Sequence, residues 1–367
     1  MSSQNILRGG VLAFTIPMLF SALATSGLAQ QAEKSSWSFF GDARLRHESN
    51  DLMAPAPDWH RERAFIRLNG VYHYTDGLEL GVRAVTGSAD NNHPFFDLGN
   101  GGLGKVGFHF DRLYLRYQPD FFDIGTLWVG KFGNPVQRNP IYGDLVNDCD
   151  AQLEGALIEM EPGPLGPFDS TRLLLGQVVA LEQAAGEEST FSMLGWSGAS
   201  NIDAQSKFEL TSTYYFYGDL TPDGSGALLN TRNARSGGNF TSDFGVLETV
   251  AAYHFDDFIF TGEYIKNFRA ADGVGDTGWA LGGLMKTKKG KFYYQYQVLE
   301  QDAVYANFAQ DDFLYPTNHA SHLVGWKKPL SSAVLFHVWA MASKMDESFG
   351  ALNETVTRIR VALTVKF

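Results

Sequence analysis

The sequence contains a single cysteine, Cys149, among its 367 residues, so no disulfide can form within the chain. Without a second cysteine, this thiol has no sequence partner for redox or metal chemistry, and we expect it to be a bystander. Charged residues are also scarce, at 19% of the chain compared with about 25% in typical soluble domains. The fold must therefore be stable without covalent cross-links and with few charges.

A basic excess is lacking as well, because the formal net charge is −12. Nucleic acid is therefore not an expected partner. Proline is limited to 13 residues, whereas aromatic residues reach 14% and glycine reaches 39 residues. Many aromatic and glycine residues with modest charge are typical of strands that face lipid on one side and water on the other.

The one long hydrophobic run lies at the start of the chain, and residues 1–29 are expected to be a secretory signal peptide. The run extends from Val11 to Ala24, about 14 residues, which is short of the ~20 that a spanning helix needs. A small-x-small cleavage site ends at Ala29, so residues 30–367 are expected to form one mature domain. An exported chain with no later helix is expected in the periplasm or, as a barrel, in the cell outer membrane.

The mature chain consists of alternating segments about as long as a tilted strand that crosses a bilayer. The clearest segment is the C-terminal TVTRIRVALTVKF, in which Ile359, Val361 and Leu363 alternate with more polar residues up to Phe367. A last strand that ends on an aromatic residue resembles the assembly signal of outer-membrane barrels. Phe367 is therefore expected to be read by the barrel-assembly machinery.

The periodicity predicts sixteen strands, although fourteen or eighteen would also fit. They are expected near residues 37–48, 60–73, 78–88, 109–118, 126–133, 153–161, 171–182, 189–198, 206–217, 243–255, 258–269, 277–287, 291–302, 318–328, 332–345 and 354–367. Short and long connections alternate between them. We therefore predict an all-β fold, a closed transmembrane antiparallel β-barrel with short periplasmic turns and long extracellular loops.

Four stretches carry a resemblance to a known family: WSFFGDARLRHES, RERAFIRLNGVYHYTDGLELGVRAVTGS, DRLYLRY and LWVGKFGNP. They resemble the N-terminal part of a family of outer-membrane porins from Gram-negative bacteria, and they lie within the first 160 residues of the chain. The resemblance implies an outer-membrane channel, either trimeric or monomeric, with no settled substrate.

The first five expected strands concentrate basic residues on one face, which should point into water because arginine facing lipid is costly. The expected pore-lining basic wall consists of Arg44, Arg46, Arg61, Arg63, Arg67, Arg83, Arg112, Arg116 and Lys131. Arginine stays charged and binds carboxylate and phosphate groups. These residues could select solutes, or they could only brace the wall by pairing with Asp42, Glu48 and Glu79.

The connection after the fifth expected strand, residues 134–152, is a candidate constriction loop. Its acidic residues, together with one at the start of the next strand, are Asp144, Asp148, Asp150 and Glu154. Opposite a basic wall they would create a transverse electric field that favours small polar solutes. The alternative is an acidic surface loop, and the sequence does not decide between the two or between anion and cation preference.

These observations predict a porin that forms a water-filled channel for passive diffusion of ions and small hydrophilic solutes. The alternatives are a substrate-specific channel or exporter for an oligosaccharide or an anion, and a barrel lipid hydrolase. No catalytic residues are expected, because His319 and Ser321 lack an evident acidic partner. No metal or cofactor is expected either. The expected partners are outer-membrane lipid and lipopolysaccharide, the assembly machinery, small solutes and further copies in a homotrimer.

Overall fold

The computed structural model describes residues 35–51, 58–88, 93–99, 105–181, 189–220, 233–310, 312, 316–345 and 355–367. The expected signal peptide lies outside these residues. Within the described ranges, no helix is long and apolar enough to cross a membrane.

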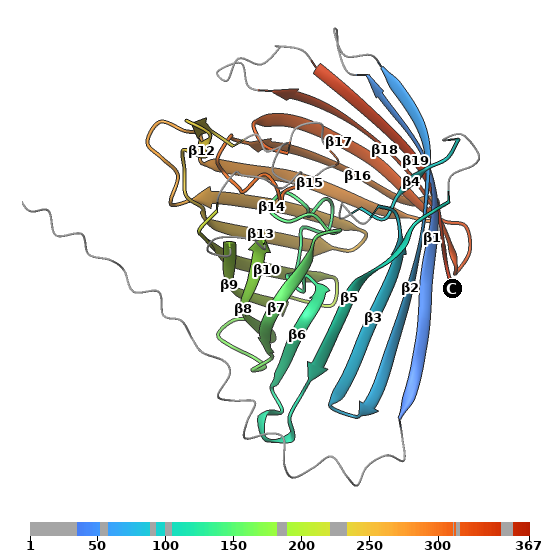
Figure 1. Cartoon of the computed structure of the whole chain (residues 1–367), viewed down its shortest axis with the longest axis vertical. Helices are drawn as coiled ribbons and strands as arrows, with labels where there is room; N and C mark the ends of the chain where they lie inside the picture. The colour runs from blue at the N-terminus through green and yellow to red at the C-terminus, as the bar shows by residue number, and fades with distance from the viewer. Residues whose placement is uncertain are drawn as a thin grey trace, which may run out of the picture.

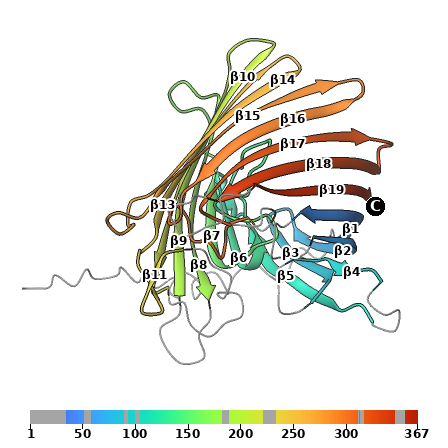
Figure 2. The same ribbon diagram turned by 90° about the horizontal axis from the view of Figure 1, so that it is seen from above.

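Sixteen antiparallel strands form one continuous wall (Figures 1 and 2). They are β1 (Ser36–Asp51), β2 (Trp59–Thr75), β3 (Leu78–Thr86), β5 (Phe108–Tyr117), β6 (Gly125–Gly133), β7 (Gln152–Met160), β8 (Ser170–Leu181), β9 (Ser189–Asn201), β10 (Ser206–Gly218), β13 (Gly245–Phe255), β14 (Phe258–Asn267), β15 (Thr277–Thr287), β16 (Gly290–Leu299), β17 (His319–Pro329), β18 (Val334–Met345) and β19 (Thr355–Lys366). Each strand pairs with its neighbours in sequence, and β1 also pairs with β19. The wall therefore closes into a barrel, which confirms the predicted fold class.

The first and last strands meet along most of their length, from the Asp42–Lys366 pair to the Asp51–Thr357 pair. Figure 1 shows the C-terminus beside β1. The final residue joins the ladder, since Gly41 N donates to Phe367 O at 2.8 Å and Phe367 N donates to Gly41 O at 3.1 Å. Phe367 thus completes the closure, while its role as an assembly signal stays a prediction.

The connections differ at the two ends of the barrel, as the sequence predicts. Two-residue turns join β2 to β3, β13 to β14 and β15 to β16. A longer turn between β5 and β6 contains a short 3-10 helix, η2 (Asp120–Phe122). The opposite end carries the long connections, which include residues 134–151 and 300–318.

Three short strands lie outside the predicted set. β4 (Phe96–Asp97) pairs with β2 beyond the end of β3, and β11 (Arg235–Ser236) pairs with β12 (Asn239–Phe240). Two residues are too few to show an alternating pattern, so the sequence could not reveal them. Among the sixteen wall strands, the boundaries differ from the predicted ones by a few residues at most.

The outer face of the wall is apolar, and side chains such as Leu113, Leu194 and Leu281 are about 60% exposed there. The interior is divided into two sides. An apolar cluster that includes Phe132, Phe191 and Tyr215 fills the side lined by β6–β10 and β13–β16. The opposite side, lined by β1–β3, β5 and β19, carries the arginine residues. The barrel is therefore filled on one side and polar on the other.

Candidate functional site

The candidate constriction loop, residues 134–151, lies inside the barrel against the inner face of β14–β18. Asn139 Nδ2 donates to Glu263 Oε2 on β14 at 3.0 Å. Ile141 is 6% exposed and packs with Ile259, Leu284 and other apolar residues of β14–β18. At the end of the loop, Asp148 N donates to Phe308 O at 2.7 Å. The loop thus folds inward and is anchored at several points.

Local hydrogen bonds explain how this loop keeps its shape without a strand partner. Asn134 Oδ1 accepts from Val136 N at 3.0 Å, Asn139 Oδ1 accepts from Ile141 N at 3.0 Å, and Asp148 Oδ1 accepts from Asp150 N at 2.7 Å. Such two-residue side-chain turns satisfy backbone groups that lack a ladder. Between the turns, Leu145 and Val146 are almost fully buried in the apolar cluster.

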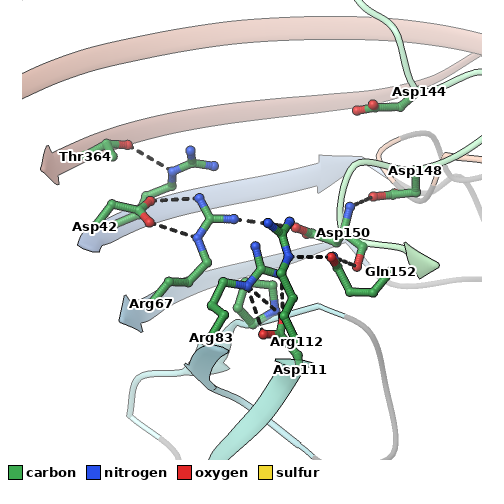
Figure 3. Close-up of polar contacts among 12 residues, drawn as sticks. Asp42, Arg67, Arg83, Asp111, Arg112, Asp144, Asp148, Asp150, Gln152 and Thr364 are labelled. Carbon is green, nitrogen blue, oxygen red and sulfur yellow. Dashed lines mark hydrogen bonds and ion pairs between the residues drawn. The ribbon is translucent and has the colours of Figure 1, made fainter. Parts of the chain in front are cut away.

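Eight of the nine predicted wall residues point into the barrel; they are Arg44, Arg46, Arg61, Arg63, Arg67, Arg83, Arg112 and Arg116. Several are braced by carboxylates (Figure 3). Arg67 binds Asp42 through two hydrogen bonds of 2.9 and 2.8 Å. Arg83 pairs with Asp111, and Arg116 lies 3.4 Å from Glu79. The bracing alternative therefore holds for this part of the wall.

Two arginines of the same wall have neutral partners instead. Arg44 Nε donates to Thr364 Oγ1 at 2.9 Å. Arg112 Nε donates to Gln152 Oε1 at 2.7 Å (Figure 3). Neither forms an ion pair with a carboxylate of the described residues. Nearby carboxylates act on them only at a distance: Asp42 and Asp150 on Arg44, and Asp111 on Arg112.

Lys327 extends the basic wall to β17. Its Nζ atom lies 5.1 Å from the centre of the Tyr293 ring, and no carboxylate of the described part of the chain pairs with it. It lies close enough to Arg44 and Asp144 to interact with their charges. Lys327 was not predicted from the sequence, because β17 follows the basic strands by some 200 residues and the alternating pattern alone does not bring them together.

A second basic group surrounds Glu48, which is completely buried. Glu48 lies 3.2 Å from Arg46 and 2.6 Å from Arg61, and it also pairs with Arg360 of β19. Arg63 pairs with Asp97 at 2.9 Å. Arg360 and its neighbour Arg358 were missed as wall residues, although barrel closure against β1 would have indicated them.

Some of the acidic residues of the loop face the basic wall. Asp150 lies 3.8 Å from Arg67, and Asp144 pairs with Arg138 of the same loop at 2.5 Å. Asp148 is mostly buried and holds the turn described above. Cys149 lies between the last two acids, and its side chain is exposed. An acidic loop therefore does lie opposite arginines inside the barrel.

Two predicted site residues are on the other face of the wall. Lys131 and Glu154 are cross-strand partners, and their side chains form an ion pair of 2.6 Å with exposures of 41% and 56%. Their neighbours Phe132 and Leu153 are buried in the interior cluster, so the alternation of the strands points Lys131 and Glu154 outward. The prediction that they line the pore is therefore wrong.

The residues weighed for catalysis and metal binding lie in different surroundings. His319 and Ser321 are buried inside the barrel, and Ser321 Oγ donates to Ser343 Oγ at 2.7 Å. This is not a lipid-facing hydrolase arrangement. Asp148, Cys149 and Asp150 bring three ligand-type atoms within 4.8 Å of one another, the one such group in the described ranges, but they are successive residues of an acidic turn.

Comparison with known proteins supports the fold but gives no sequence relative. No family model matches the chain, and no curated protein matches its sequence. The specific family resemblance of the N-terminal stretches therefore stays a prediction.

Several solved porin structures share the architecture. OprB of Pseudomonas putida has a TM-score of 0.58 at 10% identity, covering 90% of this chain and 94% of that chain. OmpF of Salmonella typhi, in complex with daunomycin, has a TM-score of 0.56 at 11% identity, covering 90% and 97%. A mutant of the Rh. blastica porin has a TM-score of 0.52 at 13% identity, covering 90% and 100%. The chain therefore has the fold of bacterial porins.

Replacing Glu48 by glutamine should destabilise the barrel, because Arg46, Arg61 and Arg360 would lose their shared counter-charge. Removing one partner of a buried ion pair costs about 3–5 kcal/mol. We expect a lower temperature for conversion of the folded to the unfolded band in gel-shift assays. The matched control is Glu62→Gln, since Glu62 pairs with His47 at an exposed site and should change stability by less than about 1 kcal/mol. Equal effects of the two variants would contradict this role of Glu48.

Proposed function

We propose that this chain forms a water-filled channel in the outer membrane for passive diffusion of ions and small hydrophilic solutes. The observation that carries the proposal is the inward-folded loop 134–151, whose acidic side faces the arginine wall inside the closed barrel. We infer that the solute path runs along this charged side. The porin fold is consistent with it. A sixteen-stranded barrel is wide enough for a water-filled lumen. Because apolar side chains fill one side of this barrel, water and polar solutes are expected along the charged side only.

Charges of opposite sign lie on the two sides of the proposed solute path. Asp144 and Asp150 project from the loop, whereas Arg44, Arg67 and Arg112 project from the wall. Fixed charges of opposite sign across a narrow passage order water and disfavour apolar solutes. Small polar molecules with separated charge are therefore the expected solutes.

An anion preference follows from the pairing of these charges. Asp42 is bound to Arg67, and Asp144 is bound to Arg138, so these acids are neutralised locally. Arg44, Arg112 and Lys327 have no such partner among the described residues. Unpaired positive charge along the proposed solute path raises the local anion concentration. We infer a moderate preference for anions, although the whole chain is acidic.

The proposed location is the outer membrane, reached through the signal peptide of residues 1–29 with cleavage after Ala29. The proposed partners are outer-membrane lipid, lipopolysaccharide and the barrel-assembly machinery. The apolar outer face supports a lipid environment.

An anion-specific channel is the second candidate, and the second basic group favours it. Arg46, Arg61 and Arg360 converge on a single buried carboxylate, and Arg63 and Arg358 lie beside them. A dedicated site would give saturable transport, whereas a diffusion pore would give flux proportional to solute concentration.

Purified, refolded protein should give discrete conductance steps in a planar lipid bilayer. In a salt gradient, the reversal potential should have the sign of an anion-preferring pore, because Arg44, Arg112 and Lys327 have no ion-pair partner among the described residues. The absence of steps from protein that still shows the heat-modifiable barrel would reject the diffusion channel. A reversal potential of the opposite sign would reject the anion preference inferred from the unpaired cations, but it would not reject the diffusion channel.

Lys327→Gln should lower the anion-to-cation permeability ratio by about twofold, since it removes one unpaired charge from the passage. The double variant with Arg44→Gln should lower it further. Lys328→Gln is the matched control, because Lys328 is the next residue of β17 and lies on the outer face near Trp326. Reversal potentials of the three variants in the same gradient make the comparison, and equal shifts for Lys327 and Lys328 would contradict the proposal.

Cys149 is a natural probe of the passage. The Cys149 side chain is exposed to solvent inside the barrel, where surrounding protein atoms reduce the hydration of the thiolate. This desolvation and the negative charges of Asp144, Asp150 and Asp148 raise the pKa of the thiol well above its usual value. Reaction with a thiolate-selective, positively charged reagent should therefore be slow at neutral pH and faster as the pH rises, because the thiolate reacts. The modification should reduce single-channel conductance.

The Cys149→Ser variant should conduct as the unmodified protein does and show no response to the reagent. Complete modification of Cys149 with unchanged conductance would place the thiol away from the conducting passage.

A further inference from the structure

Position 282 of β15 is a glycine on the inner face of the barrel. It lies between Ala280 and Leu284, which are both buried, whereas Leu281 is 59% exposed on the outer face. Gly283 follows Leu281 by two residues and therefore shares the outer face. An inward glycine among buried apolar side chains leaves a gap in the inner surface of the wall.

Ile141 of loop 134–151 fills this gap. A Cβ atom added to Gly282 would lie 2.7 Å from Ile141 Cδ1, whereas apolar carbon atoms pack at about 3.5–4.0 Å. The same atom would lie 3.1 Å from Thr261 Oγ1 and 3.0 Å from Tyr294 O, so the wall around it has little room to spare. Position 282 therefore accepts the tip of Ile141 because it has no side chain of its own.

Apolar side chains complete a socket around Ile141. Ile259 of β14 and Leu284 of β15 are cross-strand partners beside Gly282. Further members of the same buried cluster come from β16, β17 and β18, namely Tyr293, Leu323, Trp339 and Met341. The loop thus inserts one large apolar side chain into a surface built by five strands.

A second contact fixes the direction of the loop at the socket. Asn139 donates to Glu263, whose cross-strand partner Ala280 lies two residues before Gly282. Asn139 also accepts the backbone hydrogen bond from Ile141 N at 3.0 Å. The two contact points are therefore two residues apart both in the loop and on β15. The loop cannot slide along β15 without losing both contacts.

We propose that Gly282 is a positioning residue of the channel: by accepting Ile141 it holds loop 134–151 against β15 and thereby sets the width of the solute path. Figure 2 shows β15 across the barrel from β3 and β5, which carry part of the arginine wall. A side chain at position 282 would push the loop away from β15 and towards these arginines. The inference rests on the proposed channel, but the seating of Ile141 does not depend on conduction.

Gly282→Val should lower the single-channel conductance by about twofold, because the displaced loop narrows the path. Gly283→Val is the matched control, since a Cβ atom at Gly283 would have no neighbour closer than 4.0 Å. Adding Ile141→Ala to Gly282→Val should restore most of the conductance, because alanine vacates the space that valine needs. Each variant must first show the heat-modifiable barrel. Equal conductances of Gly282→Val and Gly283→Val, or no recovery in the double variant, would overturn the proposal.

Cysteine cross-linking tests the seating of Ile141 without a conduction measurement, and it also serves if Gly282→Val does not fold. In a Cys149→Ser background, the pair Ile141→Cys and Gly282→Cys should form a disulfide when the refolded protein is oxidised with copper phenanthroline. A disulfide needs Cβ atoms about 4 Å apart, and the shorter side chain at position 141 makes room for the one at position 282. The pair Ile141→Cys and Gly283→Cys is the control, because position 283 faces outward.

Protection of the thiols from a maleimide-polyethylene glycol reagent on a gel measures the yield. We expect about tenfold more disulfide from the pair at 141 and 282 than from the control pair. Equal yields, or no disulfide in folded barrel, would overturn the proposal. A disulfide between positions 141 and 282 in a protein that does not conduct would keep the socket and reject only the proposed function.

Discussion

Backbone hydrogen bonding in a membrane-spanning wall leaves no free strand edge, and the structure depends on the closure of β1 against β19. The closure joins the two ends of the described chain, with Phe367 paired to Gly41. It also brings side chains together that are 312 residues apart, as in the contact between Arg360 and Glu48. The arginine wall is therefore a product of barrel closure as much as of the N-terminal strands.

A barrel of sixteen strands is too wide for its wall side chains to fill, so the connections decide how much of the interior is open. Loop 134–151 supplies Leu145 and Val146 to the interior cluster, and the loop after β16 supplies Val304 and Tyr305. Together they pack against β6–β10 and β13–β16. On the opposite side, arginine residues and their carboxylate partners line the inner face of β1, β2 and β5.

The sequence predicted the strands well because period-two alternation is local, and each strand shows it independently of the others. The faces were harder to assign. Lys131 lies in a strand whose inward residues, Trp128 and Phe132, are apolar. The assumption that a charged side chain faces the interior fails here, because apolar side chains rather than water fill this part of the barrel. Lys327 and Arg360 were missed because their neighbours come from distant strands. The inward course of loop 134–151 depends on contacts such as Asn139 with Glu263, which no local pattern encodes.

Bracing and selection were alternatives for the arginine wall. The structure shows carboxylate bracing of Arg67 and a neutral partner for Arg44, to which we assign the proposed selection. A paired arginine such as Arg67 presents the field of a dipole, which weakens rapidly with distance once Asp42 is bound to it. Arg44 binds the Thr364 hydroxyl and lies over the Phe65 ring, and it forms no ion pair among the described residues. Its charge therefore acts over about 8 Å at physiological salt. The two residues lie on adjacent strands and differ in their partner rather than in their chemistry. In the proposed channel, the influence of each wall residue on a solute is therefore set by what that residue binds.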